Sequence, residues 1–246
     1  TGSGPAIFLT HGIGAAEDAW RFITPKLSEN FTVITYDLRG HGKSPVTYKN
    51  FGLDELVLDL ERIREKTNIN KGHFVGHSLG GMIAPAYAKK YPDKVLSVGM
   101  LSTVAGRSED DSKKVWSVIN EMEEKGIEKT LQKLTSRWFT DEFIANNSEL
   151  VKKRLNQVVD TDPDVFLNVF KIYAKTEMFP WLKDILQPCL LMTGENDGGC
   201  TPKHNENMAN QIKNSKLVIL PKLKHSFLIE GPDQVTDNLI EFINTK

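Results

Sequence analysis

The sequence has little of what would assign it to a special class of protein. Of its 246 residues only two are cysteines, Cys189 and Cys200, too few for a disulfide framework. No apolar run approaches the length of a membrane span, and no secretory leader opens the chain. Lysine and arginine are scattered and nearly balance the acidic residues, giving a net charge of −1. We therefore expect a cytoplasmic protein with no nucleic-acid or membrane partner.

What the chain does have is a regular alternation of strand-like and helix-like segments. It is 39% hydrophobic and 26% charged, as in ordinary globular proteins, and its length suits one large α/β domain or two small ones. Such alternation predicts a parallel sheet covered by helices on both faces. Residues 1–5 look like the middle of a domain, consistent with a leader or first strands lying upstream. We expect strands at residues 6–10, 32–36, 73–76, 95–101, 189–193 and 217–220, and helices at 18–27, 53–63, 79–90, 204–212 and 232–243.

The alternation is interrupted in the middle of the chain. From residue 108 to residue 186 no strand pattern is evident, and helical stretches are expected at 112–124, 127–138, 149–159 and 163–174. A helical block between two halves of one sheet is best explained as an insertion. We predict a core domain formed by residues 1–104 and 187–246, and a helical cap formed by residues 105–186.

The chain is organised around the segment Gly76-His77-Ser78-Leu79-Gly80, which lies between an expected strand and an expected helix. This is a G-x-S-x-G pattern in the strand–turn–helix setting of a nucleophile elbow. A serine at the apex of so sharp a turn has a strained backbone, and side chains at Gly76 and Gly80 would collide with the chain. The turn pushes the hydroxyl outward, so we predict that Ser78 is a nucleophile.

A serine nucleophile needs a base and an acid that orients the base, and both are expected on loops after later strands. His225 alone among the histidines combines a loop position, a preceding strand and a place downstream of Ser78, so we predict that it is the base. Asp197 and Glu195 compete for the role of the acid. The glycines at 198 and 199 indicate the tight backbone that an inward-pointing acid needs, which favours Asp197; taken alone, Asp197 would more often be an acid that forms a turn.

Two backbone amides are expected to form an oxyanion hole. One is the amide of Leu79, at the start of the helix after the elbow, where amides lack partners. The other is the amide of Ile13, in the segment His11-Gly12-Ile13-Gly14 after the first strand. Without Ser78 this segment would be an ordinary glycine turn. For His11 and His41, both in glycine loops, we expect structural hydrogen bonds.

No metal or other cofactor is expected. Cys200 and His204 have helical spacing, but Pro202 interrupts the pair and further ligands are not evident. The segment Gly40-His41-Gly42-Lys43-Ser44 lacks the spacing of a phosphate-binding loop. A small organic molecule is therefore the expected partner.

Four segments together form a recognisable pattern: Leu9-Thr10-His11-Gly12, Tyr36-Asp37-Leu38-Arg39-Gly40-His41-Gly42-Lys43-Ser44, Gly76-His77-Ser78-Leu79-Gly80-Gly81, and His225 with Glu230-Gly231-Pro232-Asp233. In these segments, and over essentially its whole length, the chain resembles the α/β-hydrolase superfamily. The resemblance implies an α/β-hydrolase fold, that is, a mostly parallel sheet flanked by helices, with an inserted helical cap.

The cap suggests a narrower resemblance. Arg137-Trp138-Phe139-Thr140, followed by Phe143, is similar to a cap segment of 3-oxoadipate enol-lactonases and related carboxylesterases. This resemblance implies a small ester or lactone as substrate, with Arg137 and Trp138 in the binding site and Arg137 holding a carboxylate. The alternative interpretation is that Arg137 is a surface helix residue and Trp138 a core residue.

The sequence also departs from parts of the superfamily. Ser226 follows His225 where C–C hydrolases of the meta-cleavage type usually have tryptophan, and Ser78 stands where haloalkane dehalogenases have aspartate. The strand hairpin that usually precedes the His11-Gly12 loop in relatives is lacking.

Our hypothesis from the sequence is a cofactor-free serine hydrolase that forms an acyl-enzyme on Ser78. One rival is a C–C bond hydrolase or an acyltransferase that uses the same three residues. Another is a ligand-binding receptor that keeps the triad and signals by closing its cap. An inert scaffold is hard to reconcile with a complete triad.

Overall fold

The strand segments join into one six-stranded sheet in the computed structural model, which describes residues 1–46 and 50–245. Residues 47–49 and 246, which fall in the predicted core domain, lie outside the described residues. The strands follow the order β2-β1-β3-β4-β5-β6, and every pairing between them is parallel. They are β1 (Ala6–Thr10), β2 (Thr32–Tyr36), β3 (Gly72–His77), β4 (Val95–Leu101), β5 (Cys189–Gly194) and β6 (Ser215–Leu220).

The strand order places a crevice at the carboxyl end of the sheet. From β1 the chain moves outward to β2 and then returns to the other side of β1 to form β3. The loops after β1 and β3 therefore leave the sheet side by side, at the point where the direction of winding reverses. Open α/β sheets bind their ligands at such a point. The predicted nucleophile follows β3, and the predicted oxyanion loop follows β1.

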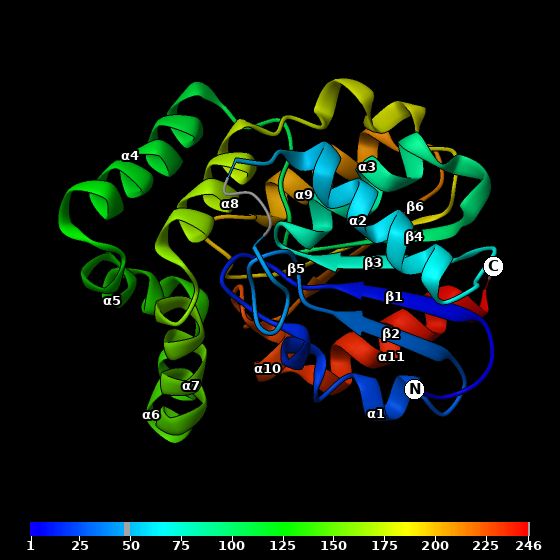
Figure 1. Cartoon of the computed structure of the whole chain (residues 1–246), viewed down its shortest axis with the longest axis horizontal. Helices are drawn as coiled ribbons and strands as arrows, with labels where there is room; N and C mark the ends of the chain where they lie inside the picture. Colours follow the sequence, from blue (N-terminus) through cyan, green and yellow to red (C-terminus); the bar gives the residue numbers. More distant parts are fainter. Residues whose placement is uncertain (47–49, 246) are drawn as a thin grey trace.

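Helices cover both faces of the sheet, as Figure 1 shows. On one face, α3 packs against β3 and β4, α2 packs on α3, and α9 packs on β5 and β6. On the other face, α11 lies against β6 and contacts α1. These helices are α1 (Thr24–Leu27), α2 (Leu53–Lys66), α3 (Gly80–Lys90), α9 (Pro202–Gln211) and α11 (Pro232–Asn244).

The inner strands are buried along most of their length because both faces are covered, whereas the edge strands β2 and β6 are mostly half-buried. All residues of β1 and β5 are buried, as expected for parallel strands between helical layers. The helices are amphipathic instead: α2 buries Leu56, Val57 and Leu60 and turns most of its charged residues to solvent, although Arg64 is buried. Among the described residues, no helix combines the length and the apolar character that crossing a bilayer would require.

Five further helices lie between β4 and β5 and form a block beyond the carboxyl ends of the strands (Figure 1). The block has an apolar cluster of its own, formed by Met122, Leu131, Leu134, Val158 and Phe166. Its last helix also packs into the main core, which fixes the block to the sheet domain. The helices are α4 (Glu109–Lys125), α5 (Ile127–Trp138), α6 (Asp141–Asn146), α7 (Ser148–Val159) and α8 (Pro163–Lys175).

The structure corrects the helix expected at residues 18–27. That stretch forms a short 3-10 helix, η1 (Glu17–Trp20), and the single-turn helix α1. Pro25 lies in the first turn of α1, where it has no amide to continue a helix from upstream. Four short elements were not expected either, because each spans too few residues for a helical period to be recognised: η2 (Pro92–Lys94), α6, η3 (Phe179–Asp184) and α10 (Phe227–Glu230).

Candidate active site

Ser78 lies at the turn between β3 and α3 in a strained conformation. Its φ is +57°, a left-handed value that residues other than glycine rarely adopt. A Cβ on Gly76 would lie 1.9 Å from the carbonyl oxygen of Gly80, and a Cβ on Gly80 would lie 2.2 Å from that of Thr10. Both glycines are therefore required by backbone contacts, as the sequence indicates. The Ser78 amide donates to the carbonyl of Leu101 (2.8 Å), which fixes the turn to β4.

Asp197 follows β5 and is buried against His225. Its Oδ2 lies 2.8 Å from His225 Nδ1 and also accepts a hydrogen bond from the Ser102 hydroxyl at 2.8 Å. Its Oδ1 accepts from the amides of Gly199 and Cys200, each at 2.9 Å. Burial by itself would raise the pKa of Asp197, but the charge of His225 and these hydrogen bonds hold it well below its usual range. Asp197 is therefore a carboxylate at neutral pH.

The structure separates Asp197 from its competitor but not for the expected reason. Glu195 turns away and accepts a hydrogen bond from the Lys222 amide (2.8 Å). A Cβ on Gly198 would meet no atom within 4 Å, and one on Gly199 would make only an ordinary contact at 3.7 Å. The expectation of a tight glycine backbone here is wrong. Asp197 is held by the hydrogen bonds described above instead.

His225 follows β6 and faces the cavity into which Ser78 also projects. Burial by itself would lower the pKa of His225, but the Asp197 carboxylate outweighs burial and raises that pKa above its usual value. Because Asp197 accepts from Nδ1, the neutral ring has Nε2 free to accept a proton. In the described part of the chain no hydrogen bond joins Ser78 to His225; such contacts often tighten only when substrate binds.

The other histidines near the site have structural partners. His77 Nε2 contacts the carbonyl oxygen of His225 at 2.9 Å, and burial lowers the pKa of His77 to about 3. A ring that stays neutral can hold this contact only by donating from Nε2, so His77 fixes the backbone of His225. His11 Nε2 accepts from the Leu38 amide (2.9 Å), and His41 Nε2 accepts from the Gly14 amide (3.1 Å).

The loop after β1 passes directly over the elbow. A Cβ on Gly12 would lie 2.9 Å from Ser78 Cβ, so only glycine allows so close an approach. The carbonyl of Gly12 contacts His11 Nδ1 at 2.8 Å, and Arg154 donates to the carbonyls of Ile13 (2.9 Å) and Gly14 (2.6 Å). Among the described residues, the amides of Ile13 and Leu79 have no protein acceptor. They are the two amides predicted to form the oxyanion hole.

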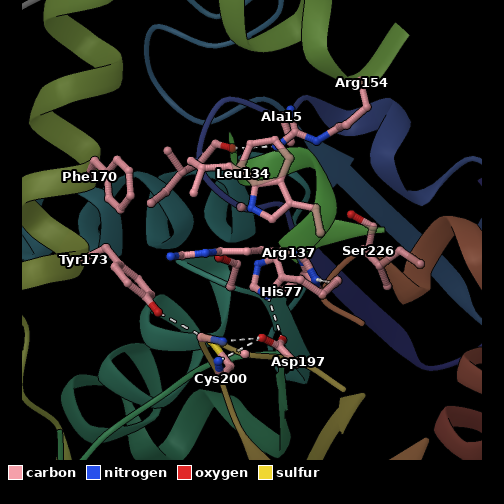
Figure 2. A pocket seen from close by; sticks show the side chains of 18 of the residues that line it. Ala15, His77, Leu134, Arg137, Arg154, Phe170, Tyr173, Asp197, Cys200 and Ser226 are labelled. Atoms are coloured by element: carbon pink, nitrogen blue, oxygen red, sulfur yellow. Dashed lines mark hydrogen bonds and ion pairs between the residues drawn. The ribbon is translucent and has the colours of Figure 1, made fainter. Parts of the chain in front are cut away.

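A cavity lies between the elbow and the helical block. Its floor includes Ser78, Asp197 and His225, and side chains of the block form its roof and walls. In Figure 2, Arg154 and Ala15 lie together at one end of the cavity, and Asp197 and Cys200 lie at the other. Apolar side chains supplied by the block are Val115, Val118, Leu134, Trp138, Phe166 and Phe170.

Both residues predicted to bind substrate line this cavity. Arg137 is largely exposed, at the end of α5, and Trp138 is partly buried beneath the Arg154 guanidinium, 5.0 Å from its ring centroid. The carbonyl of Trp138 also accepts from the Ser226 amide (2.9 Å), so α5 contacts the loop that bears His225. Arg137 is a surface helix residue, as the alternative interpretation holds, but it also lies at the edge of the cavity, where a substrate-binding residue would be.

Two cavity arginines were missed from the sequence. Arg107 stacks on the ring of Tyr173, 4.4 Å from its centroid. Arg154 lies three residues after Val151 and four before Val158, both buried, so its helical position could have shown that it faces inward. The sequence around Arg107 has no comparable pattern that would have shown which way its side chain faces. Like Arg137, neither has a carboxylate partner within the described residues.

The cluster of metal-ligand type differs from the pair considered from the sequence. It consists of Asp197, Cys200 and His225, whose ligand atoms lie within 4.8 Å of one another. His204 lies elsewhere and contacts Asp111 at 3.5 Å. The Asp197 oxygens already accept the hydrogen bonds described above, so a metal ion would have to displace them. The cluster therefore fits a hydrogen-bonded pair better than a metal centre.

Comparison with known proteins gives one family. The family model of the alpha/beta hydrolase fold matches residues 5–143. The chain is 27% identical to 3-oxoadipate enol-lactonase 1 of Acinetobacter baylyi over 242 residues, which cover 98% of this chain and 89% of the relative. It is 24% identical to (E)-2-((N-methylformamido)methylene)succinate hydrolase of the same organism, over 99% of this chain and 92% of the relative.

Solved structures agree on the architecture. The enol-lactonase from Burkholderia xenovorans LB400 superposes with a TM-score of 0.91 at 23% identity, covering 99% of this chain and 92% of that one. A thermophilic esterase from Thermogutta terrifontis gives 0.90 at 24% identity, covering 100% and 91%. At these identities the likeness establishes the fold, as expected from the sequence. The chain is a member of the alpha/beta hydrolase fold family.

Proposed function

We propose that this protein is a serine hydrolase that cleaves a small carboxylic ester or lactone through an acyl-enzyme on Ser78. The observation that carries the proposal is the buried Asp197–His225 contact of 2.8 Å, facing the cavity into which the strained Ser78 projects. A serine, an orienting carboxylate and a histidine, in this order along the chain and on these loops, are the machinery of acyl transfer in this fold.

The reaction follows from the roles of these groups. His225 Nε2 takes the proton of the Ser78 hydroxyl as the oxygen attacks the substrate carbonyl, and the Ile13 and Leu79 amides hold the oxyanion. Protonated His225 then gives its proton to the leaving alcohol as the C–O bond breaks. Water, deprotonated by His225, attacks the acyl-enzyme and releases the acid. Asp197 keeps the proton of the neutral ring on Nδ1 and stabilises the imidazolium.

The cavity favours a substrate that carries a negative charge. Three arginines without carboxylate partners among the described residues line it: Arg107, Arg137 and Arg154. Of these, Arg137 is at the edge, where a bidentate contact with a substrate carboxylate is open to it, and Trp138 beside it supplies an apolar surface. The enol-lactonase relatives support a small lactone or ester. We propose that residues 105–186 act as a cap that determines this selectivity.

The proposal is tested by turnover of short p-nitrophenyl esters and small enol-lactones, each with and without a carboxylate. Ser78→Ala should abolish turnover and leave thermal unfolding close to that of the wild type; turnover near the wild-type rate would contradict the assignment. Slow single turnover, with a fold stabilised by ligand, would favour a receptor instead. Turnover of C–C substrates, or acyl transfer that excludes water, would favour the rival enzymes.

A further inference from the structure

Arg154 connects the helical block to the predicted oxyanion loop. It lies on α7, and its guanidinium donates from Nη1 to the carbonyl of Gly14 (2.6 Å) and from Nη2 to the carbonyl of Ile13 (2.9 Å). The Gly14 and Ile13 carbonyls precede Arg154 in the sequence by 140 and 141 residues. The contact is therefore a specific tertiary clamp on a glycine-containing loop.

The clamp adds to other hydrogen bonds that hold the loop. His41 accepts from the Gly14 amide (3.1 Å), and the Gly12 carbonyl contacts His11 Nδ1 (2.8 Å) and accepts from the Ala15 amide (3.3 Å). Arg154 supplies donors to the carbonyls of Ile13 and Gly14. Among the described residues, the Ile13 amide has no protein acceptor. Because buried backbone groups are nearly always paired, an unpaired amide beside the nucleophile is available to a bound oxyanion.

Without Arg154 the backbone of this loop would be less restrained. Gly14 has a φ of +57°, and glycine at this position gives the backbone freedom to turn its peptide planes. Two carbonyls without donors would rotate toward water or other donors, and this rotation would pass through the Cα of Ile13 to the adjoining peptide unit, which carries the Ile13 amide. Oxyanion donors contribute most when their orientation is fixed before reaction.

We infer that Arg154 is a positioning residue for the oxyanion hole, through which α7 controls the orientation of the Ile13 amide. The inference rests on the proposed function, since an oxyanion forms only in acyl transfer. If Arg154 has this role, catalysis depends on the position of the helical block relative to the sheet domain. The stacking of Arg154 on Trp138, 5.0 Å from the ring centroid, and the Lys153–Asp18 ion pair at 3.0 Å hold α7 in that place.

The test compares Arg154→Gln with Lys152→Gln. Lys152 is exposed, lies on the same helix and does not line the cavity, so its replacement removes the same charge without touching the loop. An ester and the matching thionoester serve as substrates, because sulfur accepts poorly from oxyanion donors. We expect Arg154→Gln to lower kcat for the ester about 10- to 100-fold and to reduce the ester-to-thionoester rate ratio. Lys152→Gln should change neither.

A second readout does not require activity. Hydrogen exchange of the amides of residues 12–15 should be faster in Arg154→Gln than in Lys152→Gln, and Arg154→Lys, which keeps a cationic donor, should lie between them in both readouts. Unchanged exchange would overturn the inference, whatever the wild type hydrolyses. So would an unchanged rate ratio with a raised KM, which would make Arg154 a substrate-binding residue. Absence of ester turnover in the wild type would overturn the proposed function separately.

Discussion

The Asp197 carboxylate that pairs with His225 is buried, and burial disfavours its charged form. Two amides and the Ser102 hydroxyl compensate the carboxylate, and the carboxylate in turn raises the pKa of His225 above its ordinary value of 6.5. A protonated imidazole cannot take the proton of Ser78. Activity should therefore depend on the fraction of His225 that is neutral, and this fraction increases as the pH rises.

We accordingly expect kcat/KM for a neutral ester to rise with pH to a plateau, with a midpoint above 6.5. Asp197→Asn should move the midpoint down and lower kcat by about 10⁴-fold, because the amide no longer selects the reactive tautomer. Glu195→Gln, in the same loop, should leave both unchanged. A lowered midpoint in Glu195→Gln alone would identify Glu195 as the orienting acid.

At the residue scale the sequence predicts which loops carry reactive groups, because the strands are apolar enough to be recognised and chain order assigns the loops. It does not predict contacts that depend on approach in space. The hydroxyl of Ser102, the His77 contact with the His225 backbone and the Arg154 clamp each join segments far apart in the chain. No local pattern encodes such pairs.

The elements around the site depend unequally on their glycines. The elbow brings β3 and α3 so close that Gly76 faces the backbone of Gly80, whereas Gly198, in the loop after β5, faces open space. The same residue type is thus obligatory in one turn and replaceable in another. Only the structure distinguishes the two, because both sequences read as glycine-rich turns.

This difference predicts opposite effects of one substitution. Gly76→Ala should lower the free energy of unfolding by at least about 3 kcal/mol, since the new methyl group can be accommodated only by moving backbone. Gly198→Ala should change it by less than about 0.5 kcal/mol. Urea denaturation of both variants measures this. Equal effects would mean that the elbow is looser than the structure indicates.

Elements of three or more turns, or buried strands, are predicted well because their periodicity extends over enough residues. The helices α2, α5, α7 and α8 illustrate this, with expected and observed bounds that nearly agree. The short elements α6, α10 and η3 are set by their tertiary surroundings. In α6, for example, Thr140 caps the helix and its hydroxyl also donates to Glu230, the last residue of α10 (2.7 Å).

On the scale of the whole molecule, charge is unevenly distributed. The net charge is only −1, yet arginines without carboxylate partners in the described residues gather at the cavity. Cationic side chains outnumber the acidic ones, Asp111 and Asp197, in the cavity lining. Such an excess attracts anions over distances that salt limits, about 10 Å at 0.1 M ionic strength. The field of the cavity should therefore select substrates before they contact any residue.

We expect an ester with a free carboxylate to be preferred over its neutral methyl ester, and the ratio of their kcat/KM values to fall as ionic strength rises. Arg137→Gln should reduce this preference mainly through KM. Lys129→Gln, an exposed position on the same helix that does not line the cavity, is the control. A preference independent of salt and of Arg137 would indicate selection by shape alone.

The central claim is that Ser78 is an activated nucleophile, and fluorophosphonate labelling read by intact mass tests it most directly. We predict one adduct per chain, absent in Ser78→Ala and much slower in His225→Gln. An adduct elsewhere, or none on the folded wild-type protein, would contradict the account.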